Sequence, residues 1–285
     1  MHQFAPFTLN IKGRLLCCNR PQIMGIINVT PDSFYSLSRT ELHDEIKTRA
    51  AEMIAAGADM IDLGGYSSRP GAKDVSAAEE LSRLERGMEA IRSVSSDIPV
   101  SIDTFRAEVA HTAITRLDAN MINDISGGSL DPKMEETVAE LNVPYILMHM
   151  RGTPSTMGTL TDYEDVTAEV LADLGEKLNR LSLSGVNDII IDPGFGFAKT
   201  IEQNYELLRN LNLFHILNRP VLVGISRKSM IYRPLNTSPQ EALTGTIALN
   251  TLALCNGASI LRVHDVKEAA ETAKIVELTY PNFSL

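Results

Sequence analysis

Eight short runs rich in Ile, Val, Leu and Met alternate with longer amphipathic segments from residue 22 almost to the end of the chain. Each run is too short for a typical helix, and its apolar character is nearly continuous, as in strands that are covered on both faces. The expected strands are 22–28, 58–64, 98–103, 120–125, 143–149, 187–192, 219–226 and 258–264. This alternation predicts a parallel sheet in which a helix follows every strand.

The segments between the strands carry helical periodicity and helix-end signals. In 43–57 a stripe of apolar side chains ends before Gly57, which stands at a C-cap position. Residues 76–94 open with Ser76 and have Glu79 three residues later, which is the spacing of a capping box. Further helices are expected at 105–117, 132–141, 163–184, 200–211, 239–256 and 266–278.

Eight strand-helix units form either a closed (β/α)8 barrel or an open, doubly wound sheet. The number of units favours the barrel, and so do the polar side chains at the C-terminal end of each expected strand. Such groups beside a packed core cost free energy unless they are paired or used. We therefore expect an α/β protein with a (β/α)8 TIM barrel as a single domain, residues 1–285. Residues 7–20 are expected to form an N-terminal β-hairpin around Lys12 and Gly13.

The charge and cysteine content argue against several classes of protein. The chain has 26 basic and 36 acidic side chains, and its formal net charge of −10 repels nucleic acids and anionic lipids. No apolar run approaches the ~18 residues of a membrane span, and the N-terminus does not resemble a secretory signal. Cys17, Cys18 and Cys255 lack the spacing of a metal knuckle and the even number of a disulfide framework. We expect a cytoplasmic protein with free thiols and no nucleic-acid or membrane partner.

The polar side chains at the expected strand ends fall into three chemical groups. They are carboxylates (Asp103, Asp192 and one of Asp62 or Asp124), amides (Asn28, Asn123) and a basic group (Arg227, Lys228, Arg262 and His264, with Arg69 and Lys199 from loops). Cations that gather at one end of an acidic chain indicate an anionic ligand, and arginine and lysine suit phosphate. A carboxylate, an amide and a lysine also match the donors and acceptors of a flat 2-amino-pyrimidinone ring.

Two loops rich in proline, glycine and hydroxyl residues, 28–34 and 64–72, follow the first two expected strands. Such loops can close on an anion over a barrel mouth, although ordinary surface turns have the same composition. Residues 194–199 (GFGFAK) lack the spacing of a dinucleotide fingerprint, and no P-loop occurs. The scattered histidines argue against a transition-metal site, and His149 fits a satisfied residue near the core. One Mg²⁺ held mainly by substrate phosphates stays open.

Eight segments of the chain, in this order, resemble the dihydropteroate synthase family of pterin-binding enzymes. They are MGIINVTPDSF (24–34), GGYSSRPGA (64–72), SIDTFRAEVA (101–110), INDISGG (122–128), LMHMRGTPSTM (147–157), IDPGFGF (191–197), SRKS (226–229) and RVHDV (262–266). One segment alone is a weak signal, but together they extend over almost the whole chain. The resemblance implies a TIM-barrel transferase of folate biosynthesis that condenses 6-hydroxymethyl-7,8-dihydropterin diphosphate with 4-aminobenzoate to 7,8-dihydropteroate and diphosphate.

The resemblance also implies roles for individual residues. The pterin ring would be bound by Asp103, Asn123, Asp192 and Lys228, in a pocket lined by Met148 and Phe197. Arg262 would stack on the ring and would contact the diphosphate together with Asn28 and His264. The diphosphate site would be completed by Thr30, Asp32, Ser68 and Arg69. The site for 4-aminobenzoate, where sulfonamides compete in this family, would be framed by Phe34, Pro70, Lys228 and Ser229.

We expect a dissociative substitution that needs no covalent nucleophile. Loss of diphosphate would leave a cationic methylene group delocalised into the pterin, and the aryl amine would then attack it. The catalytic residues would be Asn28, Arg69, Lys228, Arg262 and His264, and Asn28 would also be the ligand of Mg²⁺. Stabilisation of the leaving group would supply most of the rate enhancement. The resemblance further implies a homodimer.

The chain departs from the usual family pattern at several loop positions. Tyr66 replaces a common glutamate, Ser68 a usual threonine and Ala198 a usual glycine, while 35–38 (YSLS) contains no glycine. Ser68 keeps the hydroxyl group. These changes therefore bear on loop flexibility and inhibitor response, and the implied reaction is unaffected.

Three other functions fit parts of the pattern. A methyltetrahydrofolate:corrinoid methyltransferase has a related barrel and similar pterin-site residues, but the two diphosphate loops argue against it. A non-catalytic pterin-binding paralogue is suggested by Tyr66 and the altered first loop, and an assay for product decides it. A phosphosugar isomerase is disfavoured, because no glutamate stands at a strand end as the base.

Overall fold

The computed structural model describes residues 4–29, 39–67 and 75–280. Eight parallel strands form one sheet in the order β8-β7-β6-β5-β4-β3-β10-β9. Their bounds are β3 Gln22–Asn28, β4 Met60–Gly64, β5 Val100–Asp103, β6 Met121–Asp124, β7 Tyr145–Met148, β8 Ile189–Asp192, β9 Leu222–Val223 and β10 Ile260–Val263. A parallel bridge between Ile191 and Val221 joins the two ends of this order, so the sheet curls into the predicted (β/α)8 barrel.

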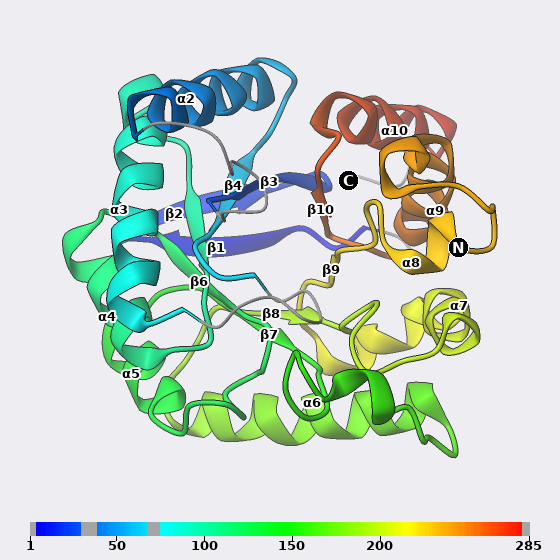
Figure 1. Cartoon of the computed structure of the whole chain (residues 1–285). Helices are drawn as coiled ribbons and strands as arrows, with labels where there is room; N and C mark the ends of the chain where they lie inside the picture. The colour runs from blue at the N-terminus through cyan, green and yellow to red at the C-terminus, as the bar shows by residue number, and fades with distance from the viewer. Residues whose placement is uncertain (1–3, 30–38, 68–74, 281–285) are drawn as a thin grey trace.

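Helices surround the strands on the outside of the barrel (Figure 1). Those that alternate with the strands are α2 Arg39–Ala55, α3 Ala77–Val94, α4 Ala107–Arg116, α5 Met134–Leu141, α6 Val166–Leu183, α7 Ile201–Arg209, α9 Leu243–Cys255 and α10 Val266–Thr279. The connections contain the shorter elements η1 Met157–Thr159, η2 Leu211–Leu217, α8 Ser229–Tyr232 and η3 Pro239–Glu241. Among the described residues, no helix is long and apolar enough to cross a bilayer.

The expected helix 239–256 is divided in the structure, and one helix start differs from its prediction. Ser238 and Glu241 form a capping box around Pro239, so η3 begins and ends as a separate turn before α9. At α3, Ser76 caps the helix by accepting a hydrogen bond from the Glu79 amide at 3.2 Å. The Glu79 carboxylate instead pairs with Arg83, four residues on, so only the Ser76 half of the predicted box forms.

The N-terminal hairpin closes one end of the barrel. β1 (Phe7–Ile11) and β2 (Arg14–Cys18) pair antiparallel, and their turn at Lys12 and Gly13 has two positive φ angles, 52° and 83°. Leu9 is only 2% exposed, because it packs on inward-facing side chains near the N-terminal ends of the strands. These side chains are Met24, Met60, Met121, Ile146, Ile190, Leu222 and Ile260.

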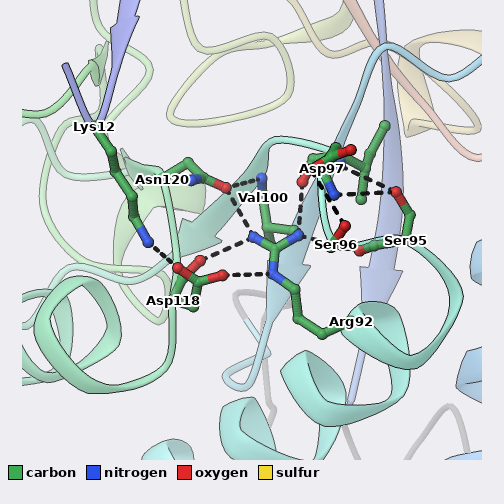
Figure 2. Close-up of polar contacts among 9 residues, drawn as sticks. Lys12, Arg92, Ser95, Ser96, Asp97, Val100, Asp118 and Asn120 are labelled. Carbon is green, nitrogen blue, oxygen red and sulfur yellow. Dashed lines mark hydrogen bonds and ion pairs between the residues drawn. The ribbon is translucent and has the colours of Figure 1, made fainter. Parts of the chain in front are cut away.

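A polar network ties the hairpin to the same end of the barrel (Figure 2). Lys12 pairs with Asp118, and Asp118 also pairs with Arg92 at 3.0 Å. Arg92 donates to the Asn120 side-chain oxygen at 2.9 Å, and that oxygen also accepts from the Val100 amide at 2.8 Å. One guanidinium group therefore links α3, the loop before β6 and the start of β5.

The side chains that point into the barrel recur at every second strand position, as a pleated strand requires. The apolar layer of Met60, Met121, Ile190 and Ile260 is therefore followed, two residues later, by a second inward layer. That second layer contains Asp62, Asn123, Asp192 and Arg262. It lies at the C-terminal end of the strands, where active sites of such barrels form.

Candidate active site

The described members of the predicted site come from the C-terminal ends of the strands or from the loops that follow them. Asn28 ends β3, Asp103 ends β5, Asn123 lies in β6, Met148 ends β7, Asp192 ends β8 and Arg262 lies in β10. Phe197, Lys228, Ser229 and His264 follow the strands β8, β9 and β10. The remaining predicted members, Thr30, Asp32, Phe34, Ser68, Arg69 and Pro70, lie outside the described residues.

Arg262 is the centre of a buried polar network across the barrel mouth. Its Nε donates to Asp62 Oδ2 at 2.6 Å, and its Nη2 donates to Asp103 Oδ2 at 2.8 Å. The side-chain amide of Asn123 donates to the same Asp62 oxygen at 3.0 Å. Since these residues come from β10, β4, β5 and β6, the network brings four strands to one point.

Burial changes the ionisation of the carboxyl groups in this network. Together with the nearby Asp62 carboxylate, it raises the pKa of Asp103 from its ordinary 3.8 to about 7, against the lowering effect of Arg262. Burial lowers the pKa of Arg262, but the carboxylates of Asp62 and Asp103 more than offset this, and the net shift is upward. The guanidinium charge therefore compensates one fully buried and one largely buried acidic group.

The structure decides between Asp62 and Asp124 as the third inward carboxylate. Both carboxylates are fully buried, but Asp62 faces Arg262, whereas Asp124 points away from the barrel interior. Asp124 accepts hydrogen bonds from the Ser126 amide at 2.8 Å and from the Tyr145 hydroxyl at 2.8 Å, and so stabilises the turn after β6. The sequence contains the signal: Asp62 lies two positions after the inward Met60, and Asp124 lies three after the inward Met121.

Asp192 and Lys228 lie on the other side of the mouth. Asp192 Oδ1 accepts from the Gly194 amide at 2.8 Å, and the Lys228 ammonium donates to the Phe195 carbonyl. Lys228 Nζ also lies 4.6 Å from the centroid of the Phe197 ring, a cation–π contact. Burial lowers the pKa of Lys228 from 10.5 to about 8 against the opposing charge of Asp192, while burial raises the pKa of Asp192.

His264 is a neutral hydrogen-bond donor, although the sequence grouped it with the cations. Burial, followed by the charges of Arg262, Arg49 and Arg227, lowers the pKa of His264 to about 3. The Ser226 hydroxyl oxygen accepts from the His264 main-chain amide at 3.2 Å and lies 3.1 Å from its Nδ1, to which it can donate. An accepting Nδ1 places the ring proton on Nε2, so this edge can donate to an anion.

Asn28 is half-buried at the end of β3, and Gly64 of the neighbouring strand makes room for its side chain. A Cβ atom at position 64 would lie 2.8 Å from Asn28 Oδ1 and 3.7 Å from the Asp103 Cβ. Glycine is therefore needed for the amide oxygen to lie in the mouth beside Asp103. One neutral amide oxygen suits a hard cation that takes its other ligands from phosphates and water.

Two of the cations grouped at the mouth from sequence are engaged elsewhere. The Arg227 Nε donates to Asp265 at 3.0 Å in a bidentate pair, so its charge is neutralised beside the start of α10. Lys199 is 9% exposed, and its Nζ donates to the main-chain oxygens of Gly194 and Phe197 at 2.9 and 3.0 Å. The sequence predicted that Lys199 and Arg227 would join the cations at the mouth, but both side chains bond to groups away from it.

An apolar wall lies beside the polar groups. Its buried members are Ile125, Met148, Met150, Met157 and Ala198, with Phe105, Leu130 and Phe197 partly buried against them. Methionine side chains are flexible and polarisable, and they contact aromatic rings favourably. The mouth therefore offers an apolar, adaptable surface next to carboxylates, an amide and an ammonium group, which together suit a flat polar heterocycle.

Tyr66, one of the departures from the usual pattern, packs on Phe105 in the turn after β5. Its ring meets Phe105 edge to face, with centroids 5.0 Å apart. The Arg106 guanidinium carbon lies 5.3 Å from the Tyr66 centroid and 4.9 Å from that of Phe105, and Arg106 pairs with the buried Glu80. Tyr66 is thus held by an edge-to-face ring contact and by a cation–π contact.

The opposite end of the barrel holds a cavity of about 600 Å³ between the hairpin and α10. Its charged groups are already paired: Arg20 bonds Asp59 at 2.6 Å, and Lys274 lies 3.7 Å from Glu277. The charged groups that line this cavity therefore have partners within it.

Comparison with known proteins gives one consistent result. Residues 24–264 match the family described as pterin binding enzyme. The chain is 44% identical over 271 residues to the dihydropteroate synthase of Escherichia coli strain K12. The matched region covers 94% of this chain and 95% of that protein. Two solved structures are similar to it with a TM-score of 0.88. A Xanthomonas albilineans dihydropteroate synthase with 4-aminobenzoic acid is 35% identical and covers 96% of this chain and 98% of its own. A Yersinia pestis dihydropteroate synthase in a sulfonamide drug complex is 39% identical and covers 96% and 100%.

The matched range runs from β3 to β10 and spans the positions of the residues that meet at the barrel mouth. Proteins that share only a fold are less similar in sequence than this chain and these relatives, which are 35–44% identical to it over almost its whole length. The chain therefore belongs to the dihydropteroate synthase family of pterin-binding enzymes.

Proposed function

We propose that this protein is a transferase that joins 6-hydroxymethyl-7,8-dihydropterin diphosphate to 4-aminobenzoate, with release of diphosphate and formation of 7,8-dihydropteroate. The observation that carries the proposal is the pairing of Arg262 with both Asp62 and Asp103, within electrostatic reach of Asp192 and Lys228. This arrangement combines carboxylates for the edge of a pterin with cations for an anionic leaving group. Membership of the family supports the same reaction.

The pterin ring would lie between the apolar wall and the buried polar groups. Asp192 and Asp103 would accept its N–H hydrogens, and the Asn123 amide would contact the same edge. The Lys228 ammonium, already directed toward the mouth by the Phe195 carbonyl, would donate to the ring oxygen. Met148 and Phe197 would contact the ring faces, as members of the wall.

The diphosphate would lie toward Asn28, Arg262 and His264. His264 would donate from Nε2 as a neutral group, and Arg262 would supply positive charge. The residues expected to complete this site, Thr30, Asp32, Ser68 and Arg69, lie outside the described residues, as do Phe34 and Pro70 of the 4-aminobenzoate site. Lys228 and Ser229, at the start of α8, would form the remaining side of that second site.

Asn28 would hold Mg²⁺ through its side-chain oxygen, and the diphosphate would supply further ligands. Mg²⁺, when bound, would neutralise charge on the departing diphosphate. The fit is chemical, since an amide oxygen at the mouth is a hard donor and Gly64 leaves space beside it.

The reaction would follow a dissociative course. The bond between the pterin methylene carbon and the bridging oxygen breaks, and its electron pair leaves with diphosphate. The lone pair of the 4-aminobenzoate nitrogen then forms the new C–N bond, and the nitrogen loses a proton. Asp103 and Asp192, as carboxylates beside the ring, would stabilise the positive charge that develops on the pterin. No side chain is needed as a covalent nucleophile.

Subunit association is a further part of the proposal: we propose a homodimer that buries the outer face of α9. This helix contains no charged residue, and Thr244, Ala248 and Leu252 are exposed at a helical spacing. An apolar helix face exposed on a monomer is typical of an interface. A cytoplasmic location, and the absence of nucleic-acid and membrane partners, stay predictions.

The test is an assay of purified protein with the pterin diphosphate and 4-aminobenzoate, with and without Mg²⁺. We expect 7,8-dihydropteroate and diphosphate in equal amounts, and loss of the reaction after chelation that added Mg²⁺ restores. Tight pterin binding with no product under any condition would instead favour a non-catalytic pterin-binding protein. Methyl transfer from methyltetrahydrofolate would favour the related methyltransferases.

A further inference from the structure

Lys199 is a buried ammonium group behind the loop that follows β8, and the proposed recognition gives it no role. Its Nζ donates to the carbonyls of Gly194 and Phe197 at 2.9 and 3.0 Å. The same nitrogen lies 3.0 Å from Nδ1 of His149, which is itself 2% exposed. These three partners surround the ammonium group inside the protein, behind the loop that follows β8.

The loop that Lys199 holds is the one that places the pterin-binding groups. Its Gly194 amide donates to Asp192, and its Phe195 carbonyl accepts from Lys228. The loop is also pressed against the chain after β7, since a Cβ atom on Gly194 would come within 2.0 Å of the His149 carbonyl oxygen. Two lysines therefore donate hydrogen bonds to three main-chain carbonyls of residues 194–197. Lys199 bonds the Gly194 and Phe197 carbonyls from behind the loop, and Lys228 bonds the Phe195 carbonyl from the side of the mouth.

We propose that Lys199 is a positioning residue for pterin binding, which fixes residues 194–197 so that Asp192, Phe197 and Lys228 keep their arrangement. This inference rests on the proposed function, because it concerns the affinity of the same site for a pterin. Lys199 would touch neither substrate. It would act through the Gly194 and Phe197 carbonyls and through its contact with His149.

The ionisation of the pair fits this arrangement. Burial, together with the Lys199 and Lys177 charges, lowers the pKa of His149 to about 2, so Nδ1 is unprotonated and accepts. Burial lowers the pKa of Lys199 to about 7, opposed by Asp192 and Asp173 and assisted by Lys228 and Arg151. As an ammonium group Lys199 has three N–H donors for these three acceptors, whereas an apolar replacement leaves two carbonyls and an imidazole without a donor.

The first test compares Lys199→Met with Lys177→Met. Lys177 is a matched control, since it is also 9% exposed but pairs with Asp173 on α6 at 2.8 Å, away from the 194–197 loop. Binding of 6-hydroxymethylpterin is measured by calorimetry, and KM is measured for each substrate. We expect Lys199→Met to weaken pterin binding about tenfold or more, as a displaced binding group does. The KM for 4-aminobenzoate at saturating pterin should change less than the pterin affinity, because that site shares only Lys228 with the displaced groups. Lys177→Met should bind pterin normally.

A folded Lys199→Met protein with unchanged pterin affinity would overturn the inference, and so would an equal loss in both lysine variants. Failure of the wild type to bind 6-hydroxymethylpterin would instead overturn the proposed function itself. Titration of the wild type and of Lys199→Met with 6-hydroxymethylpterin therefore distinguishes failure of the inference from failure of the proposed function.

A second pair of variants applies even if Lys199→Met does not fold. In His149→Asn a side-chain oxygen stands near the position of Nδ1 and keeps an acceptor for Lys199, whereas His149→Leu removes it. We expect His149→Asn to keep pterin affinity within about threefold and His149→Leu to lose about tenfold, because only the second leaves a buried donor unpaired. Equal affinities in the two variants would contradict the positioning role.

Discussion

A single guanidinium group, that of Arg262, compensates two buried carboxylates at once. Its hydrogen bonds to Asp62 and Asp103 are 2.6 and 2.8 Å long, and its side chain is 17% exposed. Charges at such depth are stable only as a set, because each is costly without the others. A residue that the proposed chemistry assigns to the leaving group thus also maintains the ionised state of the ring-binding acids.

Replacement of Arg262 by alanine should therefore affect both activity and stability. We expect kcat/KM to fall by about 10²–10³, the usual cost of losing one group that stabilises developing charge. An unchanged kcat/KM would contradict the assigned role. Without Arg262 the pKa of Asp103, already raised to about 7, should rise further.

The stability of that variant should depend on pH with a definite sign. A carboxyl group whose pKa is higher in the folded than in the unfolded state binds more protons when folded, so stability decreases as pH rises from about 4 through the folded pKa. Arg262→Ala should consequently lose more stability relative to wild type at pH 8 than at pH 5. Denaturant unfolding of both proteins at the two pH values measures this, and an equal loss at both would count against it.

Lys228 should give pterin binding an alkaline limit. Its pKa is lowered to about 8, so the ammonium that would donate to the ring is present below this pH and is lost above it. We expect the affinity for 6-hydroxymethylpterin to decrease as pH rises through about 8. Titrations from pH 6 to 10 check this, and Lys228→Met should bind weakly with no step at that pH beyond the titration of the pterin itself.

Among the elements, the strands and most helices could be predicted from sequence because their periodicities differ. Short apolar runs gave the eight barrel strands, and the hairpin turn at Lys12–Gly13 was confirmed. Helix boundaries were less accurate: α2 begins at Arg39, four residues before the expected start at His43, and the short helix α8 was not predicted. Four residues of a single helical turn carry too little periodicity to be recognised.

The candidate site was predictable as a set of strand ends, but the partners of each charged group were not. Arg227 and Arg262 look equivalent in sequence, yet one pairs beside α10 and the other crosses the barrel. The difference lies in direction: Arg262 follows the inward Ile260 by two positions, while Arg227 lies in a loop with a φ of 56°. Loop side chains have no periodicity from which a direction can be read.

The polar network at the hairpin end should stabilise the fold without affecting activity. Arg92 donates to the Ile98 and Asp118 carbonyls and to the Asn120 side chain at 2.8, 2.9 and 2.9 Å. We expect Arg92→Met to lower the free energy of unfolding by about 1–3 kcal/mol, because these acceptors lose their donor. Denaturant unfolding measures this, and kcat/KM should be unchanged.

The exposed Arg180 offers a control for Arg92. Arg180 is 49% exposed on α6 and pairs with Glu176 at 2.9 Å. Arg180→Met should cost less than about 1 kcal/mol, as exposed ion pairs do. If both variants lost a similar amount of unfolding free energy, the hydrogen bonds made by Arg92 would contribute no more to stability than an exposed ion pair.

At the scale of the whole molecule, the proposed dimer should depend on α9. Leu252 is 51% exposed on this helix, and Leu252→Glu would place a charge in the buried interface. We expect association to weaken by about 3 kcal/mol or more, because the charge would have no partner there. Sedimentation velocity detects the monomer. Leu183→Glu, at a position 81% exposed at the end of α6, should leave the wild-type distribution unchanged.

The pairing between strands is weaker at the junction of β8 and β9 than elsewhere in the described barrel. Within the described residues, β8 and the β9 segment meet through the Ile191–Val221 bridge, and β9 itself has only two residues. Asp192 stands on one side of this junction, and Lys228 follows β9 on the other. A pterin held by both residues would join the two sides of this junction, where few backbone hydrogen bonds connect the strands. Bound substrate would therefore stabilise the closed barrel at its weakest contact between strands.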